Sequence, residues 1–148
     1  MIKKNFLINS LIIFIIFLID RISKIYVIYL NNKFNGSEIF SSKFLNVYLI
    51  WNKGIAFGLF SADNNFYNFL TILIFIIILI IAYMIFKSER VKKYALIMIL
   101  GGALGNLYDR IYYKAVPDFI DFHIGELHWF IFNLADVFIT SGVFFMIL

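Results

Sequence analysis

Long apolar stretches separated by short polar segments dominate the 148-residue sequence. A helix that crosses a bilayer needs about 20 predominantly apolar residues. Four stretches meet that length and predict membrane-spanning helices at approximately 6–30, 66–86, 94–113 and 129–148. The pattern therefore predicts one integral membrane domain, residues 1–148, that is mainly α-helical.

The segment between the first two predicted helices has a different pattern. Residues 44–51 are rich in β-branched and aromatic side chains and partly alternate in polarity, which favours a strand. Residues 52–54 then form a turn signal, and 55–60 predict a second strand. We expect a small β-hairpin platform at about 40–62, on the outer membrane face.

Basic residues cluster at two places and predict the orientation of the helices. Lys3 and Lys4 precede the first apolar stretch, and a second cluster follows residue 86. Short basic loops near helix ends stay in the cytoplasm. We therefore expect cytoplasmic amino and carboxyl termini, with 31–65 and 114–128 outside. The second cluster comprises Lys87, Arg90, Lys92 and Lys93.

The basic start followed by an apolar run is also typical of a cleavable signal peptide. No small-x-small cleavage site follows it, however, and the apolar stretch continues past Asp20 to Leu30. We expect the first helix to be retained.

Composition supports membrane insertion and excludes several kinds of chemistry. The chain is 63% hydrophobic and 15% charged, whereas soluble domains are about 45–50% apolar and about 25% charged. It has no cysteine, which excludes disulfides, thiol nucleophiles and thiolate metal sites. A metal centre built on His123 and His128 would need carboxylates to complete it. The net charge of +4 forms no basic stripe for nucleic acid.

Charged residues inside the predicted helices are candidate functional groups, because each costs about 2.5–3.5 kcal/mol at membrane depth. Asp20 and Lys24 lie four residues apart and permit a mutual ion pair, which favours a structural role over catalysis. Asn106 lies one turn before Arg110 and could help to hold it. The charged set is Asp20, Arg21, Lys24, Asp109, Arg110 and Asp136. We expect these groups to meet at similar depth on the outer side.

Asp136 has no cation within a helical turn, and Asn133 lies three residues before it. Desolvation there disfavours the charged carboxylate. A second nearby carboxylate would let the two share a proton for acid/base catalysis on a carbonyl group. Asp118 and Asp121, in the predicted loop before the fourth helix, are candidates, although acidic loop residues are usually only solvated.

Glycines on the third predicted helix indicate close packing. Gly101, Gly102 and Gly105 form small-residue faces that let another helix approach. This packing role is favoured over a functional one.

Five short motifs occur in an order that resembles the bacterial lipoprotein signal peptidases, or signal peptidase II family. These are four-span intramembrane aspartyl proteases, and the similarity covers nearly the whole chain. The motifs are DRISK at 20–24, NKGIAF at 52–57, GGALGNLYDR at 101–110, VPDF at 116–119 and FNLAD at 132–136. Pro117 and Lys53 depart from the family pattern.

The resemblance implies an aspartic endopeptidase that removes signal peptides from diacylglyceryl-modified prolipoproteins, cleaving before the lipidated cysteine. It implies the Asp118 and Asp136 catalytic pair, with no metal or other cofactor. Its partners would be prolipoproteins and membrane lipids, and the enzyme would be a monomer in the bacterial cytoplasmic membrane with its site near the outer face. Site-lining residues would be Asn52, Gly54, Asn106, Arg110 and Asn133, and supporting residues would be Asp20, Lys24 and Asp109.

Three alternatives belong to other classes. Intramembrane acids also mark proton-coupled transporters, but four helices without inverted repeats fit that class poorly. A metal-dependent protease is disfavoured because the sequence has no H-E-x-x-H motif. A purely structural membrane protein would leave the isolated Asp136 unexplained.

Overall fold

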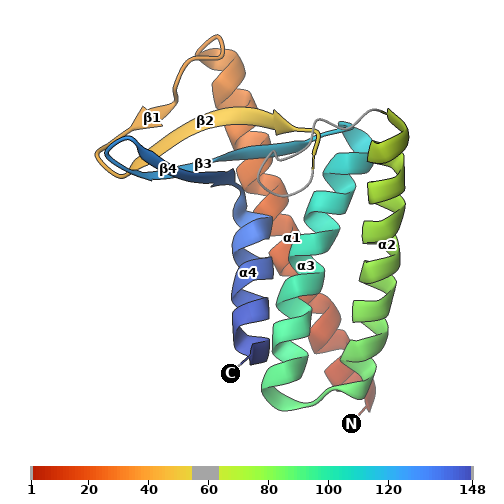
Figure 1. The fold of residues 1–148 in the computed structure, drawn as a ribbon. Coiled ribbons are helices and arrows are strands. Elements are labelled where there is room, and N and C mark those ends of the chain that lie inside the picture. Colours follow the sequence, from red (N-terminus) through yellow and green to blue (C-terminus); the bar gives the residue numbers. More distant parts are fainter. Residues whose placement is uncertain (1, 55–63, 148) are drawn as a thin grey trace.

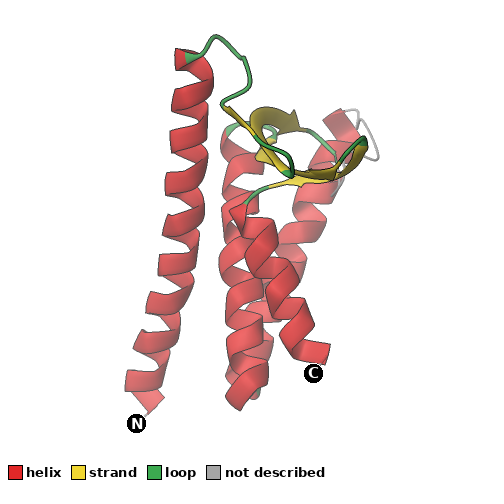
Figure 2. Ribbon diagram, turned by 90° about the vertical axis from the view of Figure 1, so that its left-hand side faces the viewer, coloured by secondary structure: helices red, strands yellow, loops and turns green. Residues whose placement is uncertain are grey.

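The computed structural model describes residues 2–54 and 64–147. In it the molecule has two layers, one of helices and one formed by a β-sheet. Within these residues four helices run side by side, and a four-stranded antiparallel sheet covers one end of them (Figures 1 and 2). Both termini lie at the opposite end (Figure 1). The helices are α1 (Ile2–Lys33), α2 (Asn64–Lys87), α3 (Arg90–Tyr112) and α4 (Leu134–Ile147).

The sheet joins two parts of the chain that are distant in sequence. Its strand order is β1-β2-β3-β4, and every neighbouring pair is antiparallel. In the register of β2 with β3, Asn52 lies opposite Val116 and Ile50 opposite Asp118. The strands are β1 (Phe40–Ser41), β2 (Leu45–Asn52), β3 (Val116–Ile124) and β4 (Leu127–Phe132).

The predicted hairpin platform was only partly correct. Residues 44–51 were expected to form a strand, and β2 occupies almost the same range. The second predicted strand, 55–60, lies outside the described residues. In the described part of the chain β2 pairs with β1 and β3, so the sheet includes residues predicted to form a connecting loop at 114–128.

The fourth predicted helix was wrong at its start, because residues 129–132 belong to β4. The helix begins only after Asn133, whose side-chain oxygen accepts the Asp136 backbone N–H at 3.2 Å. In return, Asp136 Oδ2 accepts the Asn133 backbone N–H at 3.2 Å. This reciprocal capping box fixes the helix start. Asp136 therefore lies in the first turn of α4, not two turns inside it.

Helix α3 is central and packs against the other three helices. The expected glycine faces are confirmed: Gly101 lies against Ile16 of α1, and Gly102 against the backbone oxygen of Ala135 in α4. Between these helices a buried apolar cluster includes Ile16, Ile78, Ile85, Leu96, Ile97, Leu100 and Leu107.

The described residues also show an inverted distribution of polarity. Asp20, Lys24 and Asp109 are 0% exposed, whereas large apolar residues such as Phe14 and Phe69 are at least half exposed. Such an arrangement is typical of helices that face lipid and bury their charges between them. By length and composition, Asn65–Lys87 can cross a membrane, and Leu134–Ile147 is a shorter apolar helix.

Candidate active site

Two carboxylates, Asp118 of β3 and Asp136 of α4, lie where the sheet meets the helices. Both line one cavity of about 540 Å³. Asn133 connects them, because its side-chain amide donates to Asp118 Oδ1 at 2.6 Å and its backbone N–H donates to Asp136 Oδ2 at 3.2 Å. Asn133 is fully buried, and its bond to Asp118 is shielded from bulk water.

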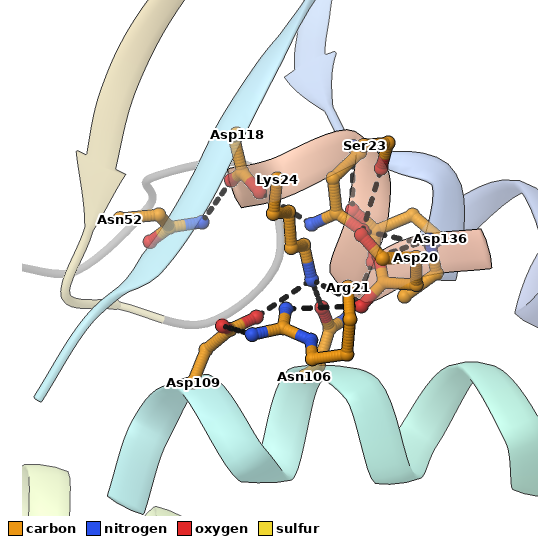
Figure 3. Close-up of polar contacts among 11 residues, drawn as sticks. Asp20, Arg21, Ser23, Lys24, Asn52, Asn106, Asp109, Asp118 and Asp136 are labelled. Atoms are coloured by element: carbon orange, nitrogen blue, oxygen red, sulfur yellow. Dashed lines mark hydrogen bonds and ion pairs between the residues drawn. The ribbon is translucent and has the colours of Figure 1, made fainter. Parts of the chain in front are cut away.

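The remaining two carboxylate oxygens accept hydrogen bonds from other asparagines. Asn52, the last residue of β2, donates to Asp118 Oδ2 at 2.8 Å (Figure 3). Asn106 of α3 donates to Asp136 Oδ1 at 2.8 Å. Each of the four oxygens therefore has an amide donor, and the donors come from three different segments. This arrangement fixes the orientation of both carboxyl groups.

Burial, and after it the negative charge of Asp136, raise the pKa of Asp118 to about 6. Hydrogen bonds from Asn52 and Asn133 oppose the shift because they stabilise the ionised form. The interaction between the two acids indicates that they titrate as a pair. Such a pair can hold one proton close to neutral pH, as acid/base chemistry on a carbonyl group requires.

A buried network of opposite charges lies beside this pair (Figure 3). Lys24 of α1 contacts Asp20 at 3.0 Å and Asp109 of α3 at 2.6 Å. Arg21 contacts the same two carboxylates, at 3.1 Å and 2.5 Å. Two cations and two anions thus compensate one another, as buried charges require. The predicted Asp20–Lys24 pair is confirmed, and it extends to α3.

Asn106 links the charge network to the carboxylate pair. Its side-chain oxygen accepts a 2.8 Å hydrogen bond from Lys24 Nζ, while its amide donates to Asp136. The expectation that Asn106 helps to hold Arg110 is not what the described contacts show. Arg110 instead donates to the Gly54 backbone oxygen at 2.8 Å.

Arg110 closes the cavity on the side of the sheet and α2. Gly54 is itself held by a hydrogen bond from its backbone N–H to Asn52 Oδ1 at 2.8 Å. Tyr67 of α2 donates to the Arg110 backbone oxygen at 3.0 Å, and its ring lies 5.6 Å from the guanidinium carbon. Among the described residues, Arg110 Nε and Nη1 are buried without a hydrogen-bond partner.

All ten site residues implied by the family resemblance belong to this one region, either around the cavity or in the charge network. Sequence reasoning named Arg21 among the candidate charges but did not predict that it pairs with both network carboxylates. It missed Tyr67, which holds Arg110. A charge next to Asp20 was a signal for the first. Nothing in the local pattern distinguished Tyr67 from an interfacial aromatic residue. Asp121 does not line this cavity; with His123 and His128 it forms a separate cluster able to hold a metal ion.

Comparison with known proteins connects this geometry to a family. A family model described as signal peptidase (SPase) II matches residues 12–148. The lipoprotein signal peptidase of Pelagibacter ubique (strain HTCC1062) is 52% identical over 146 residues, covering 98% of this chain and 88% of that protein. The lipoprotein signal peptidase of Anaplasma phagocytophilum (strain HZ) is 41% identical over 138 residues, covering 93% and 87%.

Two solved structures, each described as a bacterial membrane enzyme, have the same fold. Both superpose with a TM-score of 0.75 and cover 94% of this chain. Their sequence identities are 30% and 33%, and the aligned parts cover 84% and 89% of those chains. The similarity therefore includes the sheet as well as the helices, and it supports a membrane location.

Proposed function

Because this chain belongs to the signal peptidase II family, we propose that Asp118 and Asp136 are the catalytic pair with which it removes signal peptides from prolipoproteins. The chain is an aspartic-type peptidase, as its family and relatives indicate. The observation that carries the residue assignment is the shared environment of the two acids. They line one cavity, and Asn133 donates a hydrogen bond to each.

The proposed reaction uses one proton shared by the two carboxyl groups. The ionised carboxylate removes a proton from water as the water oxygen bonds to the scissile carbonyl carbon. The protonated carboxyl gives its proton to the carbonyl oxygen, which yields a tetrahedral diol. Transfer of a proton to the peptide nitrogen then lets the C–N bond break, releasing an acid and an amine. No metal takes part in these steps.

Polar groups around the pair would position the peptide. Asn52 and Asn133 hold Asp118, while Asn106 holds Asp136. Arg110 lines the cavity and has two buried guanidinium nitrogens without a partner in the described residues. These groups are suited to donate to a substrate backbone carbonyl, because leaving them unpaired is unfavourable.

The cavity also has an apolar side suited to the lipid of a diacylglyceryl-modified substrate. Leu70, Leu73 and Ile74 of α2 line it together with Ile139 of α4. Acyl chains that enter between these helices would gain about 0.8 kcal/mol for each buried CH₂ group. Cleavage before the lipidated cysteine follows if the lipid lies here and the peptide lies across Asp118 and Asp136.

The distribution of charge supports a location for the site in the bacterial cytoplasmic membrane. The chain termini and the basic α2–α3 connection lie at the end opposite the sheet (Figure 1). Short basic segments stay in the cytoplasm. We therefore place both termini inside and the sheet and cavity near the outer face. As separate parts of the proposal, all four helices cross the lipid and the enzyme acts as a monomer.

The test is cleavage by the purified protein in detergent of a diacylglyceryl-modified prolipoprotein, beside the same substrate without its lipid. We expect cleavage of the lipidated form alone. Asp118→Asn and Asp136→Asn should each abolish turnover without loss of folding. Glu126→Gln, which neutralises an exposed acid in the β3–β4 turn, is the matched control and should retain full activity.

Each part of the proposal has a result that would overturn it. Full activity of either aspartate variant would exclude the pair. Equal cleavage of the unlipidated substrate would exclude lipid recognition, and no cleavage by the folded wild-type protein would exclude the substrate class. Loss of turnover in chelator, with the protein still folded, would contradict catalysis without metal.

A further inference from the structure

A second cluster of chemically active side chains lies in the sheet, apart from the proposed catalytic cavity. It consists of Asp121 and His123 of β3 and His128 of β4. The two histidines are directly opposite each other in the β3–β4 register, and their rings stack with centroids 4.9 Å apart. The sequence contains only these two histidines. None of the three residues lines the cavity that holds Asp118 and Asp136.

The carboxylate of this cluster is unusually well fixed. Asp121 is 0% exposed, and its Oδ2 accepts a hydrogen bond from the Asn46 amide at 3.3 Å. His128 Nδ1 lies 3.0 Å from Oδ1 and 2.9 Å from Oδ2 of the same carboxylate. A buried acid held by a neighbouring amide resembles the outer contacts that orient metal-binding carboxylates.

The histidine on the other side of the cluster has an unused nitrogen. His123 Nδ1 is buried and has no hydrogen-bond partner among the described residues. A buried polar atom without a hydrogen-bond partner is unfavourable. An Asp121–His128 hydrogen bond alone does not remove this cost, because it leaves His123 Nδ1 unpaired. One ligand atom from each of the three residues lies within 4.8 Å of the others.

We propose that Asp121, His123 and His128 bind a divalent transition-metal ion such as Zn²⁺, with water as the fourth ligand. One carboxylate oxygen and two imidazole nitrogens form a ligand set that zinc favours. Bond lengths of about 2.1 Å place tetrahedral ligands about 3.4 Å apart. The three ligand atoms lie within 4.8 Å of one another, so the most distant pair must approach by up to about 1.4 Å. The His128 side chain is 49% exposed, which leaves room for such an adjustment.

The bound ion would cross-link β3 to β4 within the sheet. Because β3 also carries Asp118, the metal would stabilise the strand that presents one proposed catalytic acid. It would take no part in the reaction, since its ligands do not line the cavity. The expected effect is therefore on stability and not on the chemical step. This inference does not depend on the proposed peptidase mechanism.

The experiment uses the full-length protein in detergent, purified without a histidine tag and stripped of metal. Zinc titration by calorimetry should give one equivalent bound per chain, and zinc should raise the melting temperature. Cobalt, as a spectroscopic substitute, should give the visible absorption of a tetrahedral ion. His123→Gln, His128→Gln and Asp121→Asn should each weaken binding at least tenfold, about 1.4 kcal/mol. Glu126→Gln in the same hairpin should bind zinc like the wild type.

A measurement without variants guards against misfolding. The two histidines should react with diethylpyrocarbonate in the metal-free protein, and zinc should protect both of them. Binding should also weaken in acid, because protons compete for the ligand atoms. Zinc binding that is unchanged in the histidine variants would overturn the proposal. Absence of binding at micromolar zinc, or unprotected histidines in zinc, would overturn it as well.

Discussion

The side chain of Asn106 donates a 2.8 Å hydrogen bond to Oδ1 of Asp136. The same side chain accepts a 2.8 Å hydrogen bond from Lys24 Nζ. Its amide group therefore separates a buried cation from a carboxylate that would otherwise approach it. This arrangement keeps Lys24 committed to Asp20 and Asp109, and it leaves Asp136 to interact with Asp118.

Replacing Asn106 by alanine tests this separation. Asn106→Ala removes the donor to Asp136 Oδ1 and one acceptor of Lys24 Nζ, which keeps its contacts with Asp20 and Asp109. The loss therefore falls mainly on Asp136. The cost of about 1–3 kcal/mol for an unpaired buried group predicts a roughly five- to 150-fold fall in kcat/KM. The measurement is cleavage of the lipidated substrate, with the exposed Asn68→Ala as the control. Equal activity of the two variants would contradict the role assigned to Asn106.

Close packing of α3 against α1 gives a prediction with an unusual sign. A Cβ atom added at Gly105 would collide with the Asp20 carboxylate. In an open helix, glycine to alanine stabilises by roughly 0.5–1 kcal/mol. Here we expect Gly105→Ala to lower the melting temperature, and Gly105→Ser to lower it further. A higher melting temperature for the alanine variant would show that the two helices are not packed as described.

The buried charge network predicts a strong effect of removing one cation. Lys24→Met leaves two buried carboxylates with only Arg21 to compensate them, which should destabilise the protein by about 3–5 kcal/mol. Lys24→Met with Asp109→Asn restores neutrality and should be more stable than Lys24→Met alone. Melting temperatures of both variants test this, and the exposed Lys92→Met is the control. A double variant no more stable than the single variant would exclude coupling between Lys24 and Asp109.

The helices could be predicted because each contains a long apolar stretch, and the length of such a stretch indicates a membrane-spanning helix. The beginning of α4 was not predictable from hydrophobicity, since residues 129–132 are as apolar as the helix that follows. The decisive feature is the Asn133–Asp136 capping box, which is a local pattern of polar residues. The pairing of β2 with β3 joins residues about 70 positions apart, and such non-local contacts leave no signal in local periodicity.

The sequence allowed the residues of the candidate site to be identified, but not most of the contacts between them. Asp136 and the Asp20–Lys24 pair could be identified because they are charged residues in apolar surroundings. Charges at membrane depth are energetically costly and usually mark a functional or structural site. Asp118 was one of two acids in a predicted loop until the family motif selected it. Position on β3 explains the difference between those acids: Asp118 lines the cavity, whereas Asp121 contacts His128.

The pH dependence of kcat/KM should follow the ionisation of Asp118. Burial and the nearby charge of Asp136 raise the pKa of this residue to about 6. Because the proposed mechanism needs one shared proton, kcat/KM should fall as pH rises through about 6, by up to tenfold per pH unit. For folding the sign is the same: a raised carboxyl pKa gives stability that is full below the unfolded pKa and is lost as pH rises through about 6.

Asn52→Ala tests this assignment, because it removes a hydrogen bond that lowers the pKa of Asp118. The limb of the pH profile on which kcat/KM falls should therefore move to higher pH in this variant. Glu126→Gln should leave the limb in place; a limb that moves to lower pH in Asn52→Ala would contradict the assignment.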